Sequence, residues 1–437
     1  MQFTKSLQIQ NRFNELIPGG SHTYAKGDDQ YPEFMPPYID RGSGCHIWDI
    51  DGNEFIEYGM GLRSVTLGHN FEPVVSAAYA QMQRGNNFVR PAKIELDCAE
   101  EFLSVIEGAD MVKFSKDGSD ATNGAVKLAR AHTGRDMVAV CANHPFFSVD
   151  DWFIGSTPMS AGIPEVVKNM TVKFFYNDIK SAEEMFAAYP GKIACVVLEA
   201  EKYDPPRDNF LHRLRDLCHE QGALFILDEM ITGFRWHLGG AQKKYDIVPD
   251  LSTFGKALGN GFAISALAGK REFMELGGLH HQKERVFLIS TTHGAENHAL
   301  AATIANIKFF KENPVIERLD EQGRKLKEGV NKASEELGTL QHVRIIGPNC
   351  CSVYTTSDQE GKPSQPFRTL FIQETMKRGL LMPSSIVSYS HSDRDIEETV
   401  EKIHDSLVVY KKALNEGIEK YLEGKPVQPV FRKYNAG

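Results

Sequence analysis

The sequence predicts an α/β protein in which a large domain with a mainly parallel sheet is joined by a smaller composite α/β domain. Between about residues 70 and 300, short apolar segments alternate with helical patterns. The apolar segments 111–114, 137–141, 193–198 and 223–227 have the length and continuity of strands buried on both faces. Helical spacing over 120–132 and 210–220 completes the alternation that is typical of parallel sheets covered by helices.

The segments on either side of this region predict the smaller domain. A Pro- and Gly-rich stretch at 18–37 is followed by alternating residues at 45–58, in which Asp51-Gly52 predicts a hairpin. Residues 295–340 are helix-rich, and we expect a strand at 346–356 and helices at 367–378 and 393–414. We therefore expect residues 71–309 to form the large domain. The small domain is expected to combine 1–70, its N-terminal part, with 310–437, its C-terminal part.

Composition narrows the classes of partner. Lys and Arg total 49 and Asp and Glu total 58, a net charge of −9, which argues against sequence-independent binding of nucleic acid. No segment approaches the roughly 20 apolar residues that span a membrane, and Met1 to Asn11 lacks the apolar core of a signal peptide. Seven scattered cysteines without a CxxC pair indicate reduced thiols and a cytoplasmic protein. His280-His281 has no accompanying ligand motif, so we expect no metal.

The first chemically suggestive segment follows the strand at 111–114. Gly118 and Ser119 begin a predicted helix, where unpaired N–H groups, a hydroxyl and the positive end of the helix dipole can bind phosphate. The alternative is ordinary capping, with Ser119 or Asp117 as the N-cap. The sequence leaves both open.

Two carboxylates and a lysine follow other apolar segments. Glu199 follows the strand at 193–198, and Asp228 follows that at 223–227; each must meet a cation, reach solvent or cap the next segment. Lys256 lies among glycines and apolar residues at 251–262. It precedes most of those glycines and no Ser or Thr follows it, unlike a P-loop. A buried lysine with a lowered pKa suits an amine nucleophile or a Schiff base.

Together these groups match the needs of one cofactor. Pyridoxal 5'-phosphate (PLP) requires a phosphate cradle, a carboxylate for its pyridine nitrogen and a lysine for its aldehyde. Gly118 with Ser119, Asp228 and Lys256 supply the three in that order.

With these motifs the chain resembles the class III, fold-type I PLP-dependent aminotransferases, and among them the glutamate-1-semialdehyde 2,1-aminomutase-like branch. The resemblance covers nearly the whole chain. It is carried by Asp-Gly-Ser-Asp-Ala-Thr at 117–122, Lys-Leu-Ala-Arg-Ala-His-Thr-Gly-Arg at 127–135, Gly-Ile-Pro-Glu-Val-Val-Lys at 162–168, Tyr-Asn-Asp at 176–178, Leu-Asp-Glu-Met-Ile-Thr-Gly-Phe-Arg at 227–235, Thr-Phe-Gly-Lys at 253–256 and Ser-Thr-Thr-His-Gly at 290–294.

The resemblance implies a role for each matching residue. Lys256 is expected to hold the cofactor as a Schiff base and, once released, to shuttle protons, while Asp228 pairs with the pyridinium nitrogen. Gly118 and Ser119 are expected to bind the phosphate. Thr292 is expected to reach the phosphate bound by the other subunit, so the resemblance also implies a homodimer with a shared active site.

Three departures from the family pattern bear on the substrate and the ring. Phe146-Phe-Ser148 stands where the family has Tyr-His-Gly, so Phe146 is the expected stacking residue; a competing register places His144 at the motif's histidine. Glu199, expected near the ring oxygen or the substrate, is followed by Ala rather than Pro. Lys26 stands about where aminomutases carry an Arg for the substrate carboxylate, and Lys cannot form a bidentate clamp.

We therefore expect an aminotransferase that moves an amino group from a small-molecule donor to a ketone or aldehyde acceptor. A sugar-like or secondary-pathway acceptor is one class considered, and the sequence names neither donor nor acceptor. The runner-up is glutamate-1-semialdehyde 2,1-aminomutase, in which donor and acceptor are one molecule. A catalytically inactive PLP-fold binding protein is a third hypothesis, against which the intact Lys256 and Asp228 argue.

Overall fold

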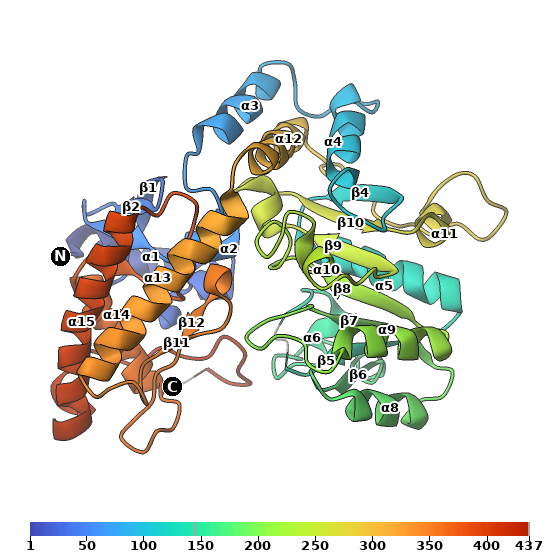
Figure 1. The fold of residues 1–437 in the computed structure, drawn as a ribbon. Helices are drawn as coiled ribbons and strands as arrows, with labels where there is room; N and C mark the ends of the chain where they lie inside the picture. Colours follow the sequence, from blue (N-terminus) through green and yellow to red (C-terminus); the bar gives the residue numbers. More distant parts are fainter. Residues whose placement is uncertain (144–145, 436–437) are drawn as a thin grey trace. The chain divides into compact units, whose positions relative to one another are not determined.

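The computed structural model describes residues 1–143 and 146–435, which form two compact units (Figure 1). The larger unit contains Arg63–Val65 and Glu72–Ile316. The smaller unit contains Met1–Leu62, Thr66–Phe71 and the chain from Glu317 onward. The smaller unit therefore combines the two ends of the sequence, whereas the larger unit is nearly continuous.

A seven-stranded sheet organises the larger unit. Its strands, in spatial order, are β4 (Met111–Ser115), β10 (Ser265–Gly269), β9 (Leu251–Phe254), β8 (Leu224–Asp228), β7 (Ile193–Leu198), β5 (Met137–Cys141) and β6 (Thr171–Phe174). All neighbours from β9 to β6 are parallel, and only β10 runs antiparallel to both of its neighbours. The predicted mainly parallel sheet is confirmed. The central strands β7 and β8 are buried along their whole length, as their uninterrupted apolar sequences predict.

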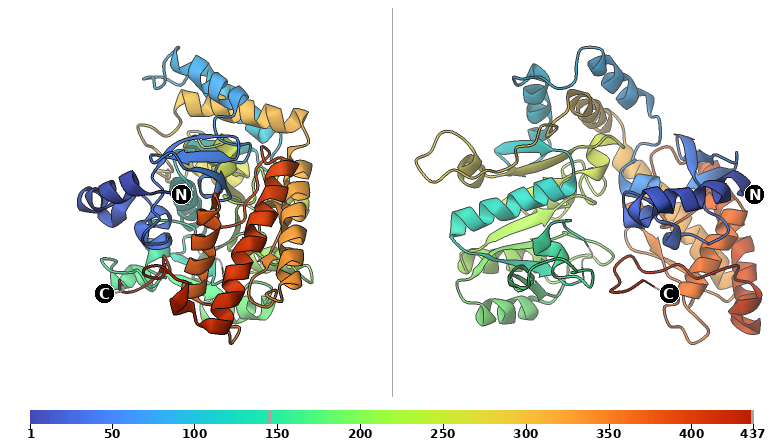
Figure 2. Two further views of the ribbon diagram at one scale, coloured as in Figure 1. Left: turned by 90° about the vertical axis from the view of Figure 1, so that its left-hand side faces the viewer. Right: turned by 180° about the vertical axis from the view of Figure 1, so that it is seen from behind.

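Helices cover both faces of this sheet. The crossover from β4 to β5 contains α5 (Gly118–Thr133), whereas α8 (Ile179–Ala188) and α9 (Phe210–Glu220) belong to crossovers that run along the sheet in the opposite direction. Because such crossovers are right-handed, the two sets lie on opposite faces (Figures 1 and 2). The other helices of this unit are α3 (Glu72–Met82), α4 (Lys93–Leu103), α6 (Asp151–Ile154), α7 (Glu165–Lys168), α10 (Gly240–Lys244), α11 (Arg271–Met274) and α12 (Asn297–Glu312).

The smaller unit has its own sheet and core. Strands β1 (Ile39–Ser43), β2 (His46–Asp49) and β3 (Glu54–Glu57) are antiparallel, and β13 (Leu380–Leu381) pairs in parallel with β3. The predicted hairpin at Asp51-Gly52 joins β2 to β3. A core that includes Phe55, Ile372 and Leu381 packs beside this sheet. The helices are α1 (Thr4–Leu16), α2 (Met60–Arg63) at the boundary, α13 (Val315–Glu336), α14 (Gln365–Lys377) and α15 (Asp393–Glu416).

The predicted continuous strand at 346–356 is wrong. The segment instead forms two short antiparallel strands, β11 (Ile345–Ile346) and β12 (Val353–Tyr354), with a 3-10 helix at Asn349–Cys351 between them. Gly347 has a left-handed φ of 89° and is followed by Pro348, which has no N–H to donate to a strand ladder. These two residues turn the chain where apolar periodicity alone predicts an extended segment.

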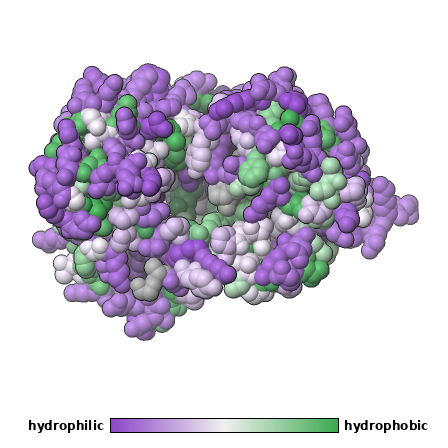
Figure 3. Space-filling model, turned by 90° about the horizontal axis from the view of Figure 1, so that it is seen from below, coloured by the Kyte–Doolittle hydropathy of each residue, from purple (hydrophilic) through white to green (hydrophobic). Residues whose placement is uncertain are grey.

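Within 1–143 and 146–435, no helix is long and apolar enough to cross a membrane. Hydrophilic residues predominate on the face drawn in Figure 3, and hydrophobic ones form scattered patches. All seven cysteines belong to the described residues and are buried, and no disulfide joins them.

Candidate active site

Three sequence-predicted groups meet at the carboxyl edge of the parallel strands in the larger unit. Asp228 ends β8, Glu199 directly follows β7, and Lys256 lies two residues after β9. In the parallel register Leu198 is opposite Leu227, and Asp228 is opposite Thr253. Adjacent parallel strands end at the same edge, so the register brings the carboxyl groups and the lysine together.

Lys256 occupies strained backbone. Its φ is 41°, in the left-handed region that a residue with a Cβ seldom adopts, and it begins the 3-10 helix Lys256–Gly259. Gly255 before it has no room for a side chain, because a Cβ there would lie 2.6 Å from the sulfur of Met230. Packing against Met230 thus requires a residue without a side chain directly before the sharp turn at Lys256.

The three groups perturb one another electrostatically. Burial raises the pKa of Asp228 to about 6, an effect that the charge of Lys256 opposes. Burial, followed by the charge of Asp228, raises the pKa of Glu199 to about 7. Burial lowers the pKa of Lys256, although both carboxylates favour its charged form. Strongly perturbed groups that cluster at the edge of a parallel sheet are typical of active sites.

A buried arginine that the sequence reasoning did not single out supports this cluster. Arg235 is 1% exposed, and its guanidinium donates hydrogen bonds to the carbonyls of Ile231 at 2.6 Å and Arg63 at 2.5 Å. The charges of Arg63 and Arg235 both lower the pKa of Lys256. Arg235 ends the quoted motif 227–235, but only the fold reveals its burial.

The start of α5 is capped by its own chain. The carboxylate of Asp117 accepts the N–H groups of Ser119 at 2.8 Å and Asp120 at 3.1 Å, so Asp117 is the N-cap. The Ser119 hydroxyl accepts the N–H of Val149 at 3.0 Å. The capping alternative is therefore correct for Asp117, and the phosphate role of Gly118 and Ser119 stays a prediction.

Met230 links the helix start to the other two groups. Its N–H donates to Asp228 Oδ1 at 2.8 Å. A Cβ built on Gly118 would lie 3.0 Å from its sulfur, and one on Gly255 would lie 2.6 Å from it. One side chain thus touches the start of α5, the turn after Asp228 and the residue before Lys256. The predicted phosphate cradle, the carboxylate and the lysine are therefore close enough together to suit PLP.

The remaining predicted residues lie in different places. Phe146 is exposed and packs edge-to-face on Phe153, with ring centroids 5.7 Å apart, while His144, the competing register, lies outside the described residues. Thr292 is exposed on the larger unit. Lys26 belongs to the smaller unit, where it lines a cavity of about 330 Å³. Within the described part of the larger unit, the contacts of Met230 bring Gly118 close to the groups at the strand ends.

Glu229 has a structural role next to Asp228. Its buried carboxylate accepts hydrogen bonds from the hydroxyl of Thr232 and from the N–H groups of Ala241 at 2.9 Å and Gln242 at 2.7 Å. It therefore ties the turn after β8 to the first residues of α10.

A partly buried lysine and a buried carboxylate at the carboxyl edge of a mainly parallel sheet, beside the glycine start of a helix, are what a PLP-dependent enzyme of fold type I requires. The class-III aminotransferase family model matches residues 27–407, and the chain belongs to this family. PLP is accordingly its cofactor.

Individual relatives cover almost the full chain. Glutamate-1-semialdehyde 2,1-aminomutase of Sulfurihydrogenibium azorense is 33% identical, and the match covers 93% of this chain and 99% of that protein. Among solved structures, the FumI protein of Sphingopyxis sp. MTA144 in a PLP form is 26% identical with a TM-score of 0.86, covering 94% and 98% of the two chains. A transaminase with PLP bound is 25% identical with a TM-score of 0.87, covering 95% and 99%.

Proposed function

We propose that this class III enzyme transfers an amino group between two different molecules, from an amino donor to a ketone or aldehyde acceptor. Gly118 and Ser119 hold the phosphate, Asp228 faces the ring nitrogen, and Lys256 binds the aldehyde. Glu199 lies at the ring edge or against the substrate, and Phe146 stacks on the ring. The meeting of Gly118, Asp228 and Gly255 around Met230 supports the first three assignments.

The electrostatics support a division of labour between Asp228 and Lys256. Bound PLP supplies an electron sink for the charge that remains when a proton leaves the carbon bearing the amino group. Asp228, ionised beside the ring nitrogen, holds the proton there. Because burial lowers the pKa of Lys256, more of its amine is neutral at pH 7 and able to accept a proton from substrate carbon. The same amine then returns the proton at the end of the transfer.

Lys26 is the observation that favours transfer between two molecules over the aminomutase. It lies on the 3-10 helix Tyr24–Lys26, at about the position where aminomutases carry a carboxylate-binding Arg, and presents one point charge instead of a planar fork. An acceptor without that carboxylate, such as a sugar-like ketone or aldehyde, suits a single lysine. The aminomutase remains the second candidate because curated relatives with that name are 33% and 31% identical across 93% of the chain.

Two substrate assays separate these candidates. An intermolecular aminotransferase converts its cofactor to the amino form with a donor alone and returns it with a carbonyl acceptor. An aminomutase isomerises glutamate-1-semialdehyde with no second substrate. We expect donor-dependent conversion and slow isomerisation; rapid isomerisation by the wild type would overturn the proposal. Lys26→Arg should improve the binding of carboxylate-bearing substrates, whereas Lys26→Gln should not.

We also propose a homodimer with a shared active site. Three apolar residues of α3, Val75, Tyr79 and Met82, recur at helical spacing and are exposed, as are Phe88 and Val89 after the helix. Exposed apolar residues that gather on one segment are typical of interfaces.

Thr292 lies next to that apolar segment. The side-chain amide of Asn87 donates to the carbonyl of Thr292 at 3.0 Å, so this exposed threonine neighbours Phe88. A second copy of the chain that covers Phe88 and Val89 would come close to Thr292, which supports a phosphate contact across the dimer. Thr292 does not cap α12, which begins at Asn297 with Glu296 as its N-cap.

The buried cysteines support a reducing compartment. All seven are buried free thiols, so no disulfide bridge stabilises the fold. We therefore assign the enzyme to the cytoplasm. Fractionation of cells that express the chain would test this assignment, and recovery with secreted proteins would contradict it.

A further inference from the structure

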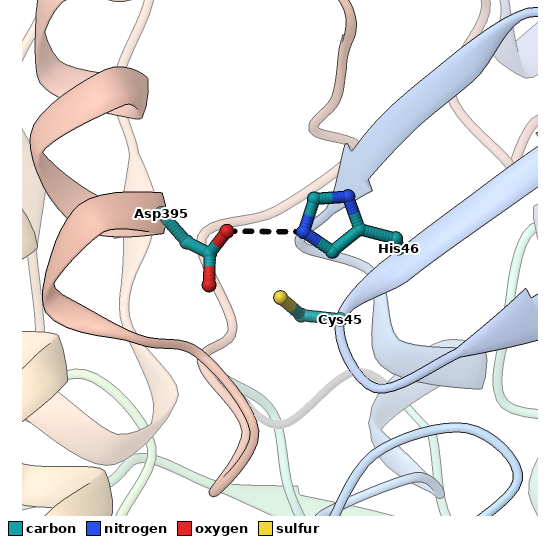
Figure 4. Close-up of side chains that lie close together, drawn as sticks. All are labelled: Cys45, His46 and Asp395. Carbon is teal, nitrogen blue, oxygen red and sulfur yellow. Dashed lines mark hydrogen bonds and ion pairs between the residues drawn. The ribbon is translucent and has the colours of Figure 1, made fainter.

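A cysteine, a histidine and an aspartate converge in the smaller unit, apart from the residues assigned to the cofactor. Cys45 Sγ, a nitrogen of His46 and an oxygen of Asp395 all lie within 4.8 Å of one another (Figure 4). Cys45 and His46 belong to the β1–β2 hairpin, whereas Asp395 belongs to the first turn of α15. Residues about 350 positions apart thus present three different metal-binding atoms to one point.

The backbone holds these side chains in place. The carbonyl of Cys45 accepts the N–H of Glu57 at 2.8 Å, and the preceding Gly44 exchanges two hydrogen bonds with His69, at 2.9 and 2.7 Å. Asp395 Oδ2 accepts the N–H of Ser392 at 2.8 Å and its hydroxyl at 2.6 Å, which completes the capping box of α15. Asp395 is therefore oriented by one oxygen and presents the other, Oδ1, to His46 at 3.0 Å.

A fourth residue lies close to the histidine. Glu54 Oε1 is 2.9 Å from His46 Nδ1, an ion-pair distance without hydrogen-bond geometry, while Asp395 Oδ1 is 3.0 Å from the other ring nitrogen, Nε2. A carboxylate at the second nitrogen of a metal-binding histidine selects the tautomer whose Nε2 lone pair faces the metal, and Glu54 is within reach of Nδ1 for that role.

The geometry points to a site for a divalent transition metal of the Zn²⁺ class, bound by Cys45 Sγ, His46 Nε2 and Asp395 Oδ1, with Glu54 as the positioning carboxylate. Thiolate, imidazole and carboxylate together suit Zn²⁺. Zinc bond lengths place tetrahedral ligand atoms roughly 3.3–3.6 Å apart, so the pair at 3.0 Å must open by a few tenths of an ångström. Binding replaces the proton of the Cys45 thiol.

The fourth coordination position has room for water. His46, Glu54 and Asp395 line a cavity of about 450 Å³, and Asp395 and His46 are only partly buried. Lys402 at the same cavity is paired with Glu398 at 2.6 Å, which offsets its charge. A metal here joins the β1–β2 hairpin to the start of α15 and so stabilises the smaller unit.

Metal titration of the PLP-loaded enzyme tests the site without reference to turnover. We expect one Zn²⁺ per chain by calorimetry, a thermal midpoint raised by Zn²⁺, and a thiolate-to-metal charge-transfer band with Co²⁺. Cys45→Ser should abolish that band, and His46→Gln should weaken Zn²⁺ binding at least tenfold. Glu54→Gln should weaken it by about tenfold, as outer carboxylates do elsewhere.

Matched controls separate this site from adventitious binding. Cys350→Ser changes another buried cysteine of the smaller unit, and Asp393→Asn changes an exposed carboxylate in the same turn of α15. Both should bind Zn²⁺ and Co²⁺ as the wild type does. A charge-transfer band that persists in Cys45→Ser, or equal Zn²⁺ affinity in His46→Gln and the wild type, would overturn the proposal. If Cys45→Ser fails to fold, His46→Gln and Glu54→Gln decide it.

Discussion

The buried carboxylate of Asp228 lowers the stability of the folded enzyme when no PLP is bound, because no cationic pyridinium ring is then present to offset its charge. Burial raises its pKa from the ordinary 3.8 to about 6, even though Lys256 opposes the shift. Replacing Asp228 with Asn in a Lys256→Ala background, with PLP removed, isolates this cost. Lys256 is removed first because otherwise the loss of its charge partner would partly cancel the gain from removing Asp228.

The magnitude follows from proton linkage. A pKa raised by about 2 units corresponds to about 3 kcal/mol, and without Lys256 the shift is larger. The unfolded chain ionises this group near pH 4, but the folded chain ionises it only above pH 6. The free energy of unfolding of the Lys256→Ala variant therefore falls as the pH rises from 4 to above 6. That of the double variant, Lys256→Ala with Asp228→Asn, does not fall for this reason. At pH 8 the double variant should be the more stable by at least about 3 kcal/mol.

The assay is urea unfolding at pH 4, 6 and 8. The fluorescence of Trp152 and Trp236, both in the larger unit, monitors the transition. The charge of Asp228 also raises the pKa of Glu199. Removing Asp228 therefore removes this repulsion as well as the burial cost of Asp228 itself, and both changes stabilise the folded state. Asp216→Asn, at an exposed position, should change stability by less than about 0.5 kcal/mol. The assigned burial cost would be refuted if the two variants had equal free energies of unfolding, or if the difference between them did not grow with pH.

Four further predictions concern the cofactor. Lys256→Ala should abolish turnover and leave PLP bound without borohydride-reducible attachment; attachment that persists would assign another amine. Asp228→Asn in the wild-type background should keep PLP but lose at least about a hundredfold in rate, or about 2.7 kcal/mol, and near-normal rates would place a different acid at the ring. Thr292→Val should weaken PLP binding by about 1–3 kcal/mol with an unchanged sedimentation coefficient, whereas lower stability with full PLP affinity would make its role local. Asp117→Asn keeps the helix cap and removes a negative charge beside the phosphate, so PLP should bind about tenfold more tightly in a direct titration; equal or weaker binding would separate the phosphate from the start of α5.

The strands that carry the site were predictable because burial on both faces leaves a plain sequence pattern. The segments 193–198 and 223–227 are apolar throughout, and the structure has strands at Ile193–Leu198 and Leu224–Asp228. A charged residue directly after such a segment is conspicuous, which is why Glu199 and Asp228 could be singled out. Their convergence followed from the parallel order of the strands.

Other features were not predictable from local pattern. The antiparallel strand Ser265–Gly269 is composed of Ser, Ala, Leu, Ala and Gly, which carries little strand propensity, and only its pairing with β4 and β9 defines it. Met230 gave no signal either, because it contacts both Gly118 and Gly255, two glycines that lie more than 100 positions apart in the sequence. Such positions depend on tertiary packing, whereas sequence periodicity reports only local burial.

The choice between Asp228 and Glu229 shows how the fold assigns function to adjacent carboxylates. Both are buried, Asp228 as the last residue of β8 and Glu229 as the next residue, so the sequence alone distinguishes them only through the family motif. Glu229 accepts hydrogen bonds from Thr232, Ala241 and Gln242, and these three donors hold it in the turn before α10. Asp228 accepts the N–H of Met230 and interacts with the charge of Lys256. Because the side chains of neighbouring residues in a strand point to opposite faces of the sheet, the two carboxylates have different surroundings, and the hydrogen bonds of Glu229 support our proposal that Asp228 is the one that meets the ring.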